Sequence, residues 1–161
     1  MQSLFILPFL TTPALACTSG TTLFSCAIAG KAQVVTVCNT GDAVTYTYGR
    51  PDRAPDISLA SAVATVGYSP WNGIGRSIYE DVTFTNAGYD YTVWGALDRQ
   101  ILEDDPADQM SGGIVVTKGD ETVAQLMCDP KTIAVALDQL WGLKEAAGQC
   151  YDRDAFEWRA C

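Results

Sequence analysis

The stretch IYEDVTFTNAGYDYTVWGALD, residues 78–98, decides the fold class of this chain. Val82 and Phe84 alternate with threonines, and further on Tyr89 and Tyr91 alternate with polar residues. A period of two is typical of β-strands that each have one apolar face. The stretch therefore predicts a β-hairpin.

The register of this hairpin follows from the shared apolar face. Residues that lie directly opposite each other in a hairpin point to the same side of the sheet. We therefore expect Phe84 to oppose Tyr89 and Val82 to oppose Tyr91, which leaves residues 85–88 as a four-residue loop.

Short β-type runs, separated by turn residues, occupy most of the remaining chain up to Cys128. They predict strands at residues 21–28, 33–38, 43–48, 57–66, 113–118 and 122–128, with a polar loop at 100–112. The Ser and Ala content of 57–66 leaves a helix open there. The expected fold class is mainly β: an antiparallel sandwich or small barrel of about eight strands.

The pattern changes after Cys128. Asp129 followed by Pro130 is typical of a helix start. Apolar residues then recur at i, i+4, i+7 and i+8, namely Ile133, Leu137, Leu140 and Trp141. We expect one C-terminal amphipathic helix that ends near Gly148. Residues 129–161 would then be a helix and a disulfide-closed tail packed on a β domain of residues 17–128.

The N-terminal segment predicts export. Residues 1–16 carry no charged side chain, contain an apolar run, and end in Ala14-Leu15-Ala16. This pattern is typical of a secretory signal peptide with cleavage before Cys17. Lipid attachment to Cys17 is the alternative. No later apolar run is long enough to span a membrane, so a periplasmic or secreted location is expected.

The six cysteines of an exported chain predict three disulfides, although spacing alone allows fifteen connectivities. Proximity of strand ends and the shared terminal position of the last two favour the pairs Cys17–Cys38, Cys26–Cys128 and Cys150–Cys161.

The charge balance of the chain disfavours some classes of binding partner. The chain has 19 acidic and 10 basic residues, a net charge of −9. An acidic protein is poorly suited to nucleic acid or to an anionic membrane surface. The balance suits solubility or a basic protein partner.

Most catalytic chemistry is excluded by composition. The chain has no His, which removes Ser-His and Cys-His pairs and His-based zinc motifs. The acidic run at 103–108 lacks the ligand order and the Gly of an EF-hand loop, so no metal or cofactor is expected. Glu80 and Asp81 are adjacent on a strand and point to opposite faces, so that pair cannot act together on one glycan.

The loop at residues 67–76 is the candidate binding site, with Tyr68, Trp71 and Arg76 as its expected binding residues. Aromatic residues and Arg commonly anchor protein interfaces, and loops on a rigid β scaffold often carry binding functions. The alternative is that Trp71 and Ile74 fold back to cap the core.

Two stretches carry a family resemblance: residues 23–26, Leu-Phe-Ser-Cys, and the hairpin at 113–128 that ends in Cys. They resemble the envelope inhibitors of C-type lysozyme, which are antiparallel barrels with a disulfide between first and last strands. The family's inhibitory Ser-Gly-x-x-Tyr motif is absent, because Val115 stands where the motif has Tyr. More of the chain resembles uncharacterised exported proteins of Gram-negative bacteria.

The sequence thus predicts a non-catalytic binding module of the cell envelope, with inhibition of a cell-wall hydrolase such as lysozyme as the specific form. The alternative is a carbohydrate-binding domain or glycan-directed hydrolase that uses Trp71 and nearby carboxylates.

Overall fold

The computed structural model describes residues 17–99 and 109–161. The predicted signal peptide at 1–16 and the acidic run at 103–108 lie outside these residues. The described chain is mainly β, with antiparallel sheets, one α-helix and three disulfides. Its strands number about twelve rather than the expected eight, and they do not form a closed barrel within the described residues.

The first sheet has five strands in the order β10-β1-β2-β3-β4. Their bounds are β1 Thr21–Ala27, β2 Val34–Asn39, β3 Ala43–Gly49, β4 Ile57–Ala62 and β10 Ala134–Val135. The candidate at 57–66 is therefore a strand that ends in a turn, because the N–H groups of Thr65 and Val66 both bond to the Ala62 carbonyl.

The second sheet also has five strands, in the order β5-β6-β7-β8-β9. Their bounds are β5 Gly67–Ser69, β6 Ser77–Asn86, β7 Tyr89–Asp98, β8 Met110–Lys118 and β9 Glu121–Met127. Two expectations are corrected here. Residues 110–112 belong to β8 rather than to a loop, and residues 67–69 of the expected loop pair with β6 as a strand.

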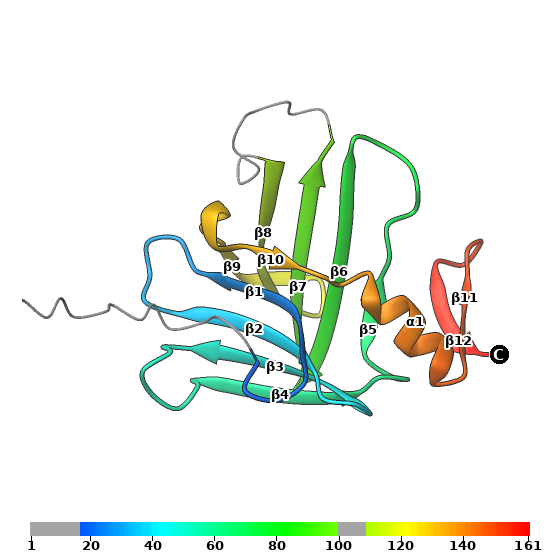
Figure 1. The fold of residues 1–161 in the computed structure, drawn as a ribbon, viewed down its shortest axis with the longest axis horizontal. Helices are drawn as coiled ribbons and strands as arrows, with labels where there is room; N and C mark the ends of the chain where they lie inside the picture. The colour runs from blue at the N-terminus through cyan, green and yellow to red at the C-terminus, as the bar shows by residue number, and fades with distance from the viewer. Residues whose placement is uncertain (1–16, 100–108) are drawn as a thin grey trace, which may run out of the picture.

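The two sheets share one hydrophobic core. Figure 1 shows the strands of the first sheet crossing those of the second at a large angle. Between them, the ring of Tyr46 from β3 lies 5.6 Å from that of Phe84 on β6. In addition, Cys26 of β1 is bonded to Cys128 just after β9. The apolar faces that the sequence pattern predicts on both sheets thus bury each other.

The central hairpin forms, but its register differs from the expected one. Phe84 lies opposite Tyr91 and Val82 opposite Val93, so the loop has two residues rather than four. Ala87 and Gly88 both adopt positive φ, 51° and 80°, as a type I′ turn requires. The first strand gains residues 85 and 86, and both strands keep their apolar faces inward, because a shift of two preserves the face.

The expected C-terminal helix is present but shorter: α1 spans Gln139–Ala146, and the segment before it forms the 3-10 helix η2 Pro130–Thr132 and strand β10. Asp129 does act as an N-cap, for η2, by accepting from the Lys131 N–H. The chain then pairs with β1, and the Ala136 N–H bonds to the Leu23 carbonyl. Strand pairing thus interrupts a segment whose apolar spacing resembles a helix.

The chain ends in the hairpin β11 Gln149–Asp152 and β12 Glu157–Ala160, which stands beside α1 in Figure 1. The Cys150–Cys161 disulfide closes this hairpin, and Cys17–Cys38 ties the start of the described chain to β2. Together with Cys26–Cys128, these are the three pairs expected from the sequence.

Candidate functional site: a groove around Glu80

The inner face of the second sheet extends beyond the part that the first sheet covers. Figure 1 shows β10 crossing β6, β7 and β8 partway along their length. Close crossing needs small residues in the sheet, since a Cβ on Gly95 would lie 2.8 Å from Val135 Cγ2. Next to Val135, residues of this inner face from Glu80 to Met110 line a hollow.

Three adjoining hollows follow this inner face. One of about 340 Å³ lies between Tyr68, Trp71, Glu80, Asp138, Trp141 and Arg153. A second of about 340 Å³ shares Glu80 and Asp138 and continues along the inner face to Leu97 and Met110. A third of about 220 Å³ shares Trp71 and Trp141 and opens towards Phe156. We call the three together the Glu80 groove.

Glu80 is a carboxylate on an otherwise apolar strand face. It has the same orientation on β6 as Val82 and Phe84, both of which are buried. The Tyr68 hydroxyl donates to Glu80 Oε1 at 2.6 Å, and the Trp71 backbone N–H donates to the same carboxylate. Glu80 therefore holds β5 and the start of the aromatic loop against β6.

Burial raises the pKa of Glu80, and the negative charge of Asp138 raises it further, while the bonds from Tyr68 and Trp71 act in the opposite direction. Asp138 occupies the N-cap position of α1 but makes no side-chain capping bond. Within residues 17–99 and 109–161, neither carboxylate has a salt-bridge partner. The groove thus contains two carboxylates that are not held in an ion pair, although Arg153 lines the same hollow.

Two indoles form the walls around these carboxylates. The Arg99 guanidinium lies 4.8 Å from the ring centroid of Trp71, and that of Arg153 lies 5.5 Å from the ring centroid of Trp141. Trp141 also packs edge-on against Trp158, with the ring centroids 5.0 Å apart. The walls therefore combine aromatic surface with guanidinium groups.

The structure brings two of the three expected binding residues to the groove. Tyr68 is only 6% exposed, and it contributes its hydroxyl to Glu80. Trp71 is half-buried and lies outside the core cluster, and Ile74 is 77% exposed, so neither residue caps the core. Arg76 does not line the groove, because Asp98 holds its guanidinium with an Nε–Oδ1 distance of 2.6 Å.

Glu80, Asp138 and Arg153 are site residues that the sequence analysis missed. Glu80 and Asp81 do point to opposite faces, since Asp81 bonds to the side chains of Ser69 and Tyr79. The partner of Glu80 is instead Asp138, which lies far away in the sequence. A charged residue in phase with Val82 and Phe84 is the one signal that could have identified Glu80.

Comparison of the chain with family models, curated proteins and solved structures gave no match. In the part of the chain that the structure describes, no three His, Cys, Asp or Glu side chains gather as a metal site. Among the same residues, no helix has the length and apolarity needed to cross a membrane.

Proposed function

We propose that this chain is an exported binding protein whose Glu80 groove accepts a cationic side chain of a basic partner protein. The observation that supports it is the pair of carboxylates, Glu80 and Asp138, which form no salt bridge among the described residues and lie in one hollow with the indoles of Trp71 and Trp141. A partially buried carboxylate without a cation is costly, and an incoming ammonium or guanidinium group would offset that cost.

The partner class follows from charge and from the predicted location. A net charge of −9 attracts a basic protein and speeds its association. Basic cell-wall hydrolases of the C-type lysozyme class are proteins of this kind in the envelope, and the sequence resemblance points to the same class. We therefore propose inhibition of such a hydrolase as the specific activity.

A glycan ligand is the second candidate, because Trp71 and Trp141 stand beside two carboxylates, as in carbohydrate-binding and glycoside-cleaving sites. The positions of two arginines make the glycan candidate less favourable than the protein partner. Arg99 and Arg153 each lie over one of the two indoles and reduce the ring surface on which a sugar could stack.

The test is calorimetric titration of the protein with a basic C-type lysozyme, together with a cell-wall lysis assay. We expect binding, inhibition of lysis, and at least tenfold weaker affinity for Glu80→Gln and for Asp138→Asn. Binding should also weaken in acid, because protonation of Glu80 removes one of the two charges. Asp120→Asn, in the exposed turn after β8, is the matched control for charge and should bind like the unmodified protein.

Each other outcome contradicts a defined part of the proposal. Absence of binding rejects the lysozyme class. Equal affinity of the Glu80, Asp138 and Asp120 variants rejects the groove as the site. Binding or cleavage of chitooligosaccharides that depends on Glu80 would favour the glycan candidate instead.

A further inference from the structure

The outer face of the first sheet carries a row of hydroxyl groups. Thr36 on β2 lies opposite Thr47 on β3, which lies opposite Ser58 on β4. Adjacent strands are about 4.8 Å apart, so these three side chains stand in line across the sheet. Thr45, two residues before Thr47, points to the same side.

This row forms the floor of a hollow with a volume of about 470 Å³. One wall is residues 17–19, which the Cys17–Cys38 disulfide holds against β2. The other wall is the loop at 50–55, which connects β3 to β4 and includes Pro51 and Pro55. We call this the threonine hollow.

The hydroxyls of the floor are available to a ligand. Within the described chain, the side chains of Thr36, Thr45, Thr47 and Ser58 make no hydrogen bond to another protein group. No described side-chain oxygen or nitrogen is both fully buried and unpartnered, so these oxygens are open to the hollow. A hydroxyl can donate one hydrogen bond and accept others. The floor therefore matches a ligand that itself carries many hydroxyls.

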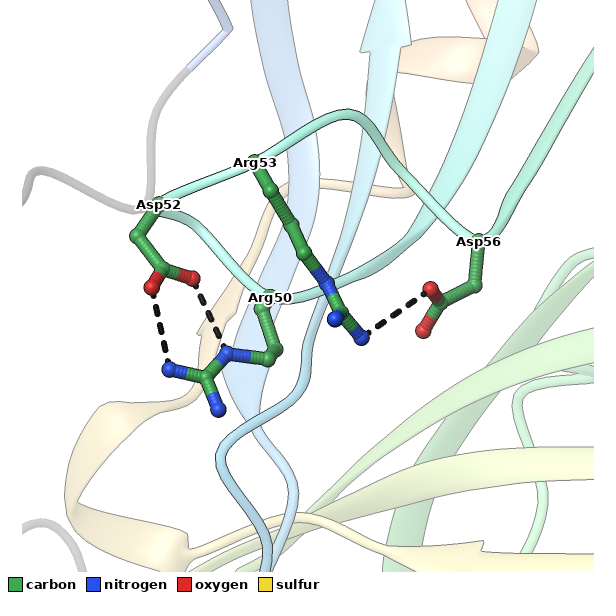
Figure 2. Close-up of polar contacts among 4 residues, drawn as sticks. All are labelled: Arg50, Asp52, Arg53 and Asp56. Carbon is green, nitrogen blue, oxygen red and sulfur yellow. Dashed lines mark hydrogen bonds and ion pairs between the residues drawn. The ribbon is translucent and has the colours of Figure 1, made fainter.

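The rim is electrically balanced, as Figure 2 shows. Arg50 donates two bonds to Asp52, at 3.0 Å and 2.9 Å, and Arg53 donates to Asp56 at 3.4 Å. Each guanidinium is thus paired within its own loop, and the rim offers no excess positive charge to an anion. An uncharged ligand would therefore suit this hollow better than an anion.

We propose that the threonine hollow binds an uncharged saccharide. Its hydroxyls would bond to Thr36, Thr47 and Ser58, and its C–H faces would pack on Pro51 and Pro55. A peptide main chain fits less well on most of the floor, because β2 and β3 are paired on both sides and only β4, which carries Ser58, is an edge strand. This site is independent of the Glu80 groove.

The test is an NMR titration of the 15N-labelled protein with chitotriose, cellotriose and maltotriose, with trigalacturonic acid as the charged counterpart. We expect at least one neutral trisaccharide to shift the amide signals of β2, β3 and β4. The double variant Thr36→Val/Thr47→Val should weaken that binding about tenfold or more, since each lost hydrogen bond contributes roughly 1 kcal/mol. Valine keeps the β-branched shape, and folding is checked from the spectrum itself.

Thr117→Val, on β8 of the other sheet, is the matched control and should bind as the unmodified protein does. The proposal is overturned if no neutral trisaccharide shifts these signals or if only trigalacturonic acid binds. It is also overturned if the double variant binds as tightly as the control, or if shifts appear only at Trp71 and Glu80.

Discussion

Lys144 is a buried cation with a structural role. Its side chain is 1% exposed, and its Nζ donates to the carbonyls of Val63 and Ala64 at 3.2 Å and 3.3 Å. The same Nζ lies 5.5 Å from the ring centroid of Trp158. This one side chain therefore fastens α1 to the turn after β4 and to the terminal hairpin.

The position of Lys144 predicts a pH dependence of stability. Burial lowers its pKa from 10.5 to about 8. Between pH 8 and pH 10 the unfolded chain therefore binds more protons than the folded one, and the free energy of unfolding should rise with pH. Above pH 10 the trend reverses, because burial raises the pKa of Tyr79 to about 12 and that of Tyr46 as well.

Urea unfolding at pH 7 to 10 would check this dependence. Lys144→Met should remove the rise between pH 8 and pH 10, whereas Met at the exposed Lys31 should leave it intact. A rise of equal size in both variants would show that Lys144 is not its source.

Trp71 should matter more for binding than for stability. It lies outside the core cluster, and its Nε1 donates to the Ile74 carbonyl at 3.2 Å. We expect Trp71→Ala to lower the free energy of unfolding by less than about 2 kcal/mol, below the 3–5 kcal/mol typical of a core Trp. Trp158→Ala is the comparison, because Trp158 packs against the core and should cost more. A larger loss for Trp71 in thermal melts would place it in the core.

At the level of elements, alternation predicted the strands well because each strand buries one face. The length of the hairpin turn was not predictable in this way, since a shift of two residues leaves every side chain on its original face. The C-terminal helix forms, but its start was placed too early for a different reason: residues 133–137 have helical spacing, but pairing of β10 with β1 determines their conformation. Nothing local in the sequence reveals that pairing.

The same limit applies to the site. The aromatic loop could be identified from composition, because Tyr68 and Trp71 are residue types that suit binding. Its partners could not, since Asp138 and Arg153 reach the groove only through the packing of α1 and β11 on the second sheet. Arg76 was expected in the site because Arg is a common binding residue, but its ion pair with Asp98 keeps its side chain out of the groove.

The turn between β6 and β7 predicts a stabilising substitution. Ala87 has φ 51°, a left-handed conformation that is unfavourable for Ala but accessible to Asn. Asn-Gly is the preferred pair for a type I′ turn. We expect Ala87→Asn to raise the free energy of unfolding by about 1 kcal/mol, and Ala87→Val to lower it, in urea titrations. An unchanged or lower stability for the Asn variant would argue against the two-residue turn.

On the scale of the whole molecule, two sheets and a terminal hairpin are held together by different means. The sheets bury apolar faces against each other, and the terminal hairpin docks through Trp158, whose Nε1 donates to the Tyr68 carbonyl at 3.0 Å. Tyr68 in turn donates to Glu80. The core, the terminal hairpin and the Glu80 groove are thus linked through one buried tyrosine.

One disulfide joins the two sheets and another lies within the terminal hairpin, so their removal should have unequal effects. Cys26–Cys128 joins the two sheets across a sequence separation of 102 residues, whereas Cys150–Cys161 spans 11 within one hairpin. A crosslink restricts the unfolded chain more when it closes a longer loop, by about 4.7 kcal/mol near 100 residues against about 3 kcal/mol near 15. Urea unfolding of the two double Cys→Ala variants should therefore show the larger loss of stability for the pair 26 and 128.

Loss of the terminal disulfide should instead affect the groove, because Arg153 lies between its two cysteines in the sequence. The variant without this disulfide should bind ligand more weakly, at little cost to the stability of the sheets. Equal losses of stability, with binding unaffected in the terminal variant, would mean that the hairpin neither depends on its disulfide nor positions the groove.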